Sequence, residues 1–133
     1  MIKIITILIC IYTLLACSSN IVTNIHNTEM RFSNIQSNFI VDDINNYNCG
    51  EIDISVLNHV LTTGVSASQK KVHDHHSTTG CSIKGQLTKK HKSVGFVFDY
   101  GGIFYFDDSS IVVCAEECCK NNFEYCTWDE QAE

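Results

Sequence analysis

Hydrophobic residues along the chain follow three successive patterns, and each pattern predicts a different kind of segment. An almost continuous apolar run extends from Ile4 to Ala16. Between residues 51 and 64, apolar side chains recur at the spacing that places them on one face of an α-helix. After Gly80, apolar and polar residues alternate, which is typical of half-buried strands. The sequence therefore predicts an apolar leader, a helical region and a sheet, in that order.

The helical region contains one helix with a strong pattern and a second with a weak one. Asn48 followed by Glu51 resembles a capping arrangement, and Gly64 suits the helix end. The apolar face of this first helix is formed by Ile52, Val56, Leu57, Val60 and Leu61. A second helix over residues 67–76, with Ser66 as its expected cap, is mostly polar and is predicted to lie on the surface.

A short strand is expected near residues 39–41, and four strands are predicted to follow the helices. The alternating stretches are residues 81–88, 94–100, 103–106 and 111–114. Gly101-Gly102 predicts a tight turn between the second and third stretches, and residues 107–110 predict the turn into the last one. The inner face of this meander would cover the first helix. We therefore predict a single cysteine-rich α+β domain over residues 39–133, with one or two helices followed by a four-stranded antiparallel meander that disulfides cross-link.

The apolar leader has the form of a signal peptide. Lys3 precedes it, and the run is shorter than the about 20 apolar residues that a spanning helix needs. Its end, Leu14-Leu15-Ala16-Cys17, resembles the lipobox of bacterial lipoproteins, in which cleavage precedes a cysteine that then carries a diacylglycerol. The resemblance implies a signal peptide over residues 1–16 and lipidation of Cys17.

Residues 17–38 would then form the lipid anchor and a tether, because they are rich in Ser, Asn and Thr. By the sorting habit of Gram-negative lipoproteins, Ser18 favours the periplasmic face of the outer membrane, where the N-terminal lipid would hold the protein. Ala16 and Ser18 also fit an ordinary small-x-small cleavage site. Cleavage there would leave a soluble secreted protein, which is the alternative to the lipid anchor.

Six of the eight cysteines are left for the domain once Cys10 is assigned to the signal peptide and Cys17 to the lipid. They are Cys49, Cys81, Cys114, Cys118, Cys119 and Cys126. An even number in an exported domain of about 100 residues predicts a disulfide framework. We expect adjacent Cys118 and Cys119 to have different partners, and Cys49 and Cys81 to bond either to each other or to the C-terminal tail. The spacing lacks the paired C-x2-C motifs of structural zinc sites, which favours disulfides over metal.

The net charge of −6 disfavours a nucleic-acid partner. Phosphate binding requires clustered Lys and Arg side chains. The one basic cluster, Lys89-Lys90-His91-Lys92, is better explained as a charged turn. An acidic surface instead suits a basic protein partner.

His73, His75 and His76 are the candidate metal ligands, because imidazoles beside a carboxylate can bind Zn or Cu. The alternative is a solvated or locally hydrogen-bonded role for these histidines. The sequence contains neither a G-x-S-x-G nor an H-E-x-x-H motif, and each cysteine after the signal peptide has an expected structural role. We therefore expect no catalytic residues and no cofactor.

Aromatic residues are concentrated on both faces of the predicted hairpin over residues 98–106. One face belongs to the core, and the other would be exposed. Tyr100 and Tyr105, beside Asp107 and Asp108, are therefore the candidate anchors for a protein partner. The alternative is that the aromatic C-terminal tail packs over the second face.

These features favour an envelope-anchored, non-catalytic protein-binding module. In layout the chain is similar to the small lipoproteins that serve as immunity proteins or as inhibitors of cell-wall hydrolases, which are short, disulfide-bonded and tethered to a membrane. The similarity is one of layout and not of motif. Two alternatives are a periplasmic Zn- or Cu-binding lipoprotein and a structural envelope protein.

Overall fold

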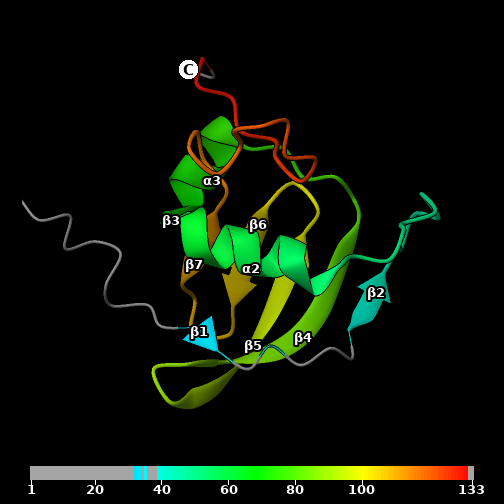
Figure 1. Cartoon of the computed structure of the whole chain (residues 1–133). Helices are drawn as coiled ribbons and strands as arrows, with labels where there is room; N and C mark the ends of the chain where they lie inside the picture. Colours follow the sequence, from blue (N-terminus) through cyan, green and yellow to red (C-terminus); the bar gives the residue numbers. More distant parts are fainter. Residues whose placement is uncertain (1–31, 34, 36–38, 132–133) are drawn as a thin grey trace, which may run out of the picture.

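A computed structural model of the chain describes residues 32–33, 35 and 39–131 (Figure 1). The predicted signal peptide, Cys17 and most of the predicted tether lie outside the described residues. The elements are β1 (Phe32–Ser33), β2 (Ile40–Asp42), α2 (Ile54–Thr63), β3 (Val65–Ser66), α3 (Gln69–His75), β4 (Ser82–Lys89), β5 (Lys92–Asp99), β6 (Ile103–Phe106) and β7 (Ile111–Val113). No helix in this part of the chain is long and apolar enough to cross a membrane.

The sheet contains the predicted antiparallel meander and extends it. β4, β5, β6 and β7 are hydrogen-bonded to one another in this order. β1 and β2 pair with the free edge of β4, and β3 pairs with β7. The α+β class is therefore confirmed, but the sheet has seven strands and not four. β2 overlaps the short strand expected near residues 39–41, whereas β1 and β3 have two residues each and are too short to show an alternating pattern in the sequence.

Positive backbone angles shape two turns of the meander. Lys90 and His91, with φ of 48° and 66°, form a two-residue turn between the paired residues Lys89 and Lys92. Two consecutive positive φ angles match the right-handed twist of the flanking strands. Lys90 and His91 thus form the charged turn that the sequence predicts, whereas Lys89 ends β4 and is buried. Gly102, with φ of 86°, lies in the tight turn between β5 and β6, where glycine adopts this conformation without strain.

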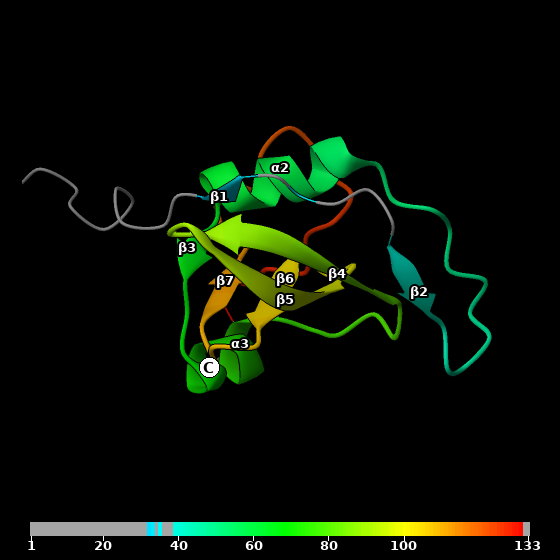
Figure 2. The ribbon, with the colours of Figure 1, turned by 90° about the horizontal axis from the view of Figure 1, so that it is seen from below.

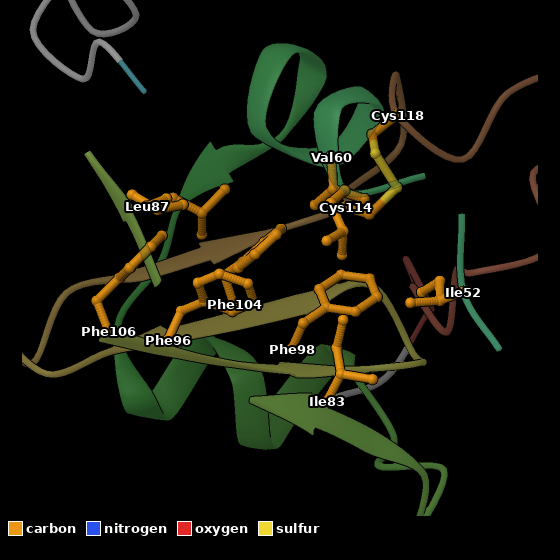
Figure 3. Packing of buried hydrophobic residues seen from close by; sticks show 12 residues of the cluster. Ile52, Val60, Ile83, Leu87, Phe96, Phe98, Phe104, Phe106, Cys114 and Cys118 are labelled. Carbon is orange, nitrogen blue, oxygen red and sulfur yellow. A yellow bond between two sulfur atoms is a disulfide. The ribbon is translucent and has the colours of Figure 1, made fainter. Parts of the chain in front are cut away.

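The two helices lie on opposite faces of the sheet (Figure 2). Because side chains alternate along a strand, one face of the meander packs against α2 and the other against α3. The larger core cluster joins Leu57 and Val60 of α2 to Phe98 and Phe104 of the sheet, whose ring centroids are 4.7 Å apart (Figure 3). The smaller cluster contains Val72 of α3. The expected covering of the first helix by the meander is confirmed.

The first helix begins later than predicted. Its N-cap is Asp53, whose carboxylate accepts a hydrogen bond from the backbone N–H of Ser55 at 2.7 Å. Asn48 and Glu51, the predicted capping pair, lie in the preceding loop, where Asn48 has a φ of 59°. The predicted cap is therefore wrong, because the disulfide at Cys49 holds this stretch in a loop.

The second helix also begins later than predicted. Ser68 caps α3 by accepting a hydrogen bond from the backbone N–H of Lys71 at 3.2 Å. Ser66, the expected cap, belongs to β3 and pairs with Val112. Pairing with β7 therefore delays the start of the helix to Gln69.

Three disulfides cross-link the domain, as predicted. Cys49 bonds to Cys81, Cys114 to Cys118, and Cys119 to Cys126. Adjacent Cys118 and Cys119 have different partners, as expected, and Cys49 and Cys81 are joined to each other. The first disulfide ties the loop before α2 to the start of β4, and the other two fold the C-terminal tail against the end of β7.

Candidate functional site

Exposed apolar side chains are concentrated in one segment of the described chain. The exposed large hydrophobic residues among those described all come from residues 40–54, with exposed fractions between 37% and 82%. They are Ile40, Val41, Ile44, Tyr47 and Ile54. We call these five side chains the β2 surface, because they belong to the edge strand β2 and to the segment that joins it to the first residue of α2 (Figure 1 shows this segment of the ribbon). Single exposed apolar residues are ordinary on a protein surface, whereas a concentration of them marks a site of interaction.

The loop that carries the β2 surface is held in place although it has no regular secondary structure. The carboxylate of Asp43 accepts hydrogen bonds from the backbone N–H groups of Tyr47, at 2.7 Å, and Cys49, at 3.1 Å. The hydroxyl of Tyr100 donates to the carbonyl of Gly50 at 2.6 Å. Together with the disulfide at Cys49, these bonds hold the conformation of the loop.

A hollow of about 390 Å³ lies between β2 and the start of α2. Its lining residues are Phe39, Val41, Glu51, Ile52, Asp53, Ile54 and Ile83. Ile52 and Ile83 are buried and form its apolar base, whereas Val41 and Ile54 belong to the β2 surface. The hollow therefore offers an apolar pocket beside two residues of the β2 surface, Val41 and Ile54.

The segment is also acidic. Residues 40–54 contain no Lys or Arg and carry the carboxylates of Asp42, Asp43, Glu51 and Asp53. The hydrogen bond from Cys49 lowers the pKa of Asp43, and the hydrogen bond from Ser55 lowers that of Asp53. Lys84 pairs with Asp42 at 2.6 Å and offsets one charge. The surroundings of the hollow are therefore negatively charged at neutral pH.

The candidate residues of the aromatic hairpin do not form one surface. Tyr100 packs with the core under α2, and Tyr105 packs with the cluster on the opposite face. Asp107 and Asp108 are exposed in the turn between β6 and β7, at the other end of β6 from Tyr100. The carboxylate of Asp108 is already bonded to Lys89 at 2.8 Å.

The aromatic tail meets both regions of the sheet. Phe123 and Tyr125 pack against the core under α2, and the ring centroid of Tyr125 is 5.7 Å from that of Tyr100. Trp128 instead packs beside α3, with its centroid 4.8 Å from the ring of His75. The tail thus covers part of the hairpin that the sequence offered as a binding surface.

The three candidate metal ligands on and after α3 point to different surroundings. The ring of His73 is exposed, with Nδ1 3.3 Å from a carboxylate oxygen of Asp74. His75 stacks on Trp128, and its Nδ1 lies 3.0 Å from the carbonyl oxygen of Asp129. Both ring nitrogens of His76 are buried without a hydrogen-bond partner, and burial lowers its pKa to about 4. Among described residues, the clusters with three ligand atoms close together contain none of these histidines.

Comparisons with protein-family models, with curated proteins and with solved structures find no match for this chain. The fold and the site therefore define only a class, a small α+β domain with three disulfides and an acidic, apolar edge beside β2.

Proposed function

We propose that the protein is an envelope-anchored, non-catalytic module that binds a basic partner protein through the β2 surface. The observation that carries this proposal is the restriction of the exposed large apolar side chains of the described chain to residues 40–54. In protein interfaces, a few aromatic and aliphatic anchors supply most of the binding energy. Tyr47 and Ile44 are the most suitable anchors, because they project from a loop that is already fixed.

The charge of the segment suggests the chemistry of the partner. Four carboxylates belong to the same segment as the apolar side chains, and residues 40–54 supply no cation of their own. A basic partner would be attracted at long range and oriented on arrival, whereas an acidic one would be repelled. An apolar side chain of that partner would enter the hollow over Ile52 and Ile83.

Preorganisation supports a tight complex. The Cys49–Cys81 disulfide and the hydrogen bonds of Asp43 and Tyr100 already order the binding loop. Binding therefore requires little further ordering of the backbone, which removes a large part of its entropic cost. This behaviour suits an immunity protein or an inhibitor of a cell-wall hydrolase. In the proposal, a lipid on Cys17 holds the module at the periplasmic face of the outer membrane.

The test couples the purified protein to beads and captures basic exported proteins from the producing cells. The captured protein is then purified and titrated calorimetrically against wild type, Ile44→Ser, Tyr47→Ala and the matched control Asp107→Asn. We expect the first two substitutions to weaken binding by roughly 10-fold or more, because each removes an interfacial anchor. Asp107→Asn, which changes the hairpin turn, is expected to bind like wild type.

Salt provides the second readout, since attraction between an acidic surface and a basic partner weakens as ionic strength rises. Equal affinity of wild type, Ile44→Ser and Tyr47→Ala would rule out the β2 surface as the interface. Loss of binding by Asp107→Asn alone would return the interface to the aromatic hairpin.

A further inference from the structure

Four sulfur atoms gather where the end of β7 meets the C-terminal tail. Cys114 is bonded to Cys118, and Cys119 is bonded to Cys126 (Figure 3 shows the first pair). The Sγ atoms of Cys114 and Cys119 belong to different disulfides and are nevertheless 3.8 Å apart. The Sγ of Cys126 lies within 4.8 Å of both. The Sγ atoms of Cys118, Cys119 and Cys126 are therefore all close to that of Cys114. We call these four sulfur atoms the sulfur quartet.

One distance in the quartet has the value found between neighbouring sulfurs of a zinc–thiolate centre. A Zn–S bond of about 2.3 Å in a tetrahedral site places neighbouring sulfurs about 3.8 Å apart. Cys114 and Cys119 already have this separation. Once reduced, the two bonded pairs would have to separate by roughly 2 Å per pair to complete a tetrahedron of this size. Rotations of the cysteine side chains can supply such a movement without refolding the tail.

The surroundings of the quartet favour a bound cation. Cys114 and Cys118 are buried, so that a metal there would be shielded from competing water. Glu116 and Glu124 lie on the same stretch of tail and contribute negative charge, whereas Glu117 is paired with Lys120. His59 borders the quartet from α2, but its Nε2 lies 2.9 Å from the carbonyl oxygen of Cys118, and we therefore leave it out of the ligand set.

We propose that reduction of the Cys114–Cys118 and Cys119–Cys126 disulfides converts the sulfur quartet into a tetrahedral zinc site. Each disulfide accepts two electrons and two protons from a dithiol reductant, whose own thiols become a disulfide. Each of the four thiols then releases its proton to solvent as its sulfur binds Zn²⁺. The oxidised quartet has no thiolate to offer, so the site exists only in the reduced protein.

The sequence disfavours such a site because it lacks paired C-x2-C motifs, and the fold explains how the ligands still meet. Cys114 is delivered by the end of β7, whereas Cys126 returns through a tail loop that contains Asn121 and Asn122 at positive φ. Asparagine tolerates this conformation better than most residues. The end of β7 and the tail loop together bring the four cysteines close to one another, which paired C-x2-C motifs do in ordinary structural zinc sites.

The test titrates the full protein under anaerobic conditions, before and after its disulfides are reduced with a phosphine that is then removed. Zn²⁺ binding is measured by competition with a chelator, and Co²⁺ binding is measured by absorption spectroscopy. Only the reduced protein is expected to bind one ion with thiolate-to-cobalt charge-transfer bands and the spectrum of tetrahedral cobalt. Cys119→Ser/Cys126→Ser should weaken zinc binding at least about 100-fold, because two of four ligands are lost. The matched control Cys49→Ser/Cys81→Ser should bind like reduced wild type.

Two further measurements separate a built site from loose thiols. If reduction alone unfolds the tail, zinc should restore the circular dichroism and the Trp128 fluorescence of the oxidised protein, as in domains that fold around their metal. The reduced protein in urea should bind zinc much more weakly. Equal affinity in urea, equal affinity of both double variants, or binding by the oxidised protein would overturn the proposal, the last result pointing to histidine ligands instead.

Discussion

Lys89 and Asp99 are the buried charged residues of the described chain, and each holds a turn of the sheet. The Nζ of Lys89 lies 2.8 Å from a carboxylate oxygen of Asp108, and this hydrogen bond lowers the pKa of Asp108 to about 2. The carboxylate of Asp99 accepts a hydrogen bond from the backbone N–H of Gly101 at 2.7 Å, while burial raises its pKa. A buried charge is tolerated only with such partners. At the scale of residues, the two buried charged side chains therefore stabilise turns between neighbouring strands.

His76 predicts how stability depends on pH. Burial, together with the charges of His75 and Lys71, lowers the pKa of His76 to about 4. In the unfolded chain the pKa of His76 is near the ordinary histidine value of 6.5. Between about pH 6.5 and pH 4, His76 is therefore protonated in the unfolded chain and neutral in the folded chain. Stability should therefore fall as pH falls through this window. The loss should be about 1 to 2 kcal/mol, reduced from the full shift because part of the ring remains exposed.

The measurement is urea unfolding between pH 4 and pH 7, followed by fluorescence of Trp128, the single tryptophan, whose ring centroid is 5.3 Å from that of His76. His76→Phe keeps an aromatic ring but cannot titrate, so its stability should decline less on acidification than that of wild type. The same slope in both proteins would show that another group controls the transition.

At the scale of elements, the cap of α3 provides a direct comparison between two serines. Ser68 accepts the hydrogen bond from Lys71 that starts the helix, whereas the nearby Ser66, also exposed, lies in β3. Ser68→Ala should reduce the free energy of unfolding by about 1 kcal/mol, because an orphan backbone N–H loses its acceptor. Ser66→Ala should have a much smaller effect. Urea denaturation of both variants checks this, and the reverse order would contradict the observed helix start.

The elements also show what could be predicted from the sequence. The helix around Leu57 and the eight-residue strands β4 and β5 follow from their periodicity, and the shorter β6 and β7 follow from the turns expected at Gly101-Gly102 and at residues 107–110. β2 overlaps the short strand expected near residues 39–41, whereas β1 and β3 could not be predicted, since two residues acquire strand geometry only by pairing with β4 or β7. The cap at Ser66 was wrong for the same reason, because tertiary pairing overrides a local capping signal.

The candidate sites were less predictable than the fold. Ile44 and Tyr47 stand out only when the packing of every other large apolar residue is known, because exposure is a property of the whole structure. Their one sequence signal is that they lie among Asn and Asp residues with no regular period. The approach of Cys119 to Cys114 likewise depends on how the tail folds back, which their spacing in the sequence does not show.

At the scale of the whole molecule, the disulfides divide the stabilisation unequally. Cys49–Cys81 closes a sequence separation of 32 residues, whereas Cys119–Cys126 closes one of 7. In the chain-entropy model, a longer loop restricts the unfolded chain more strongly. The first disulfide is also the one that fixes the loop of the β2 surface, so stability and the proposed binding share one cross-link.

We therefore expect Cys49→Ser/Cys81→Ser, under oxidising conditions, to lose about 4 kcal/mol of unfolding free energy, and Cys119→Ser/Cys126→Ser to lose about 2 kcal/mol. Guanidinium denaturation gives both values. If the β2 surface is the interface, the first variant should also bind the captured partner more weakly even where it is fully folded, because its loop must be ordered during binding. The second variant should bind normally. A first variant that loses stability and keeps full affinity would show that the loop is ordered by Asp43 and Tyr100 without the disulfide.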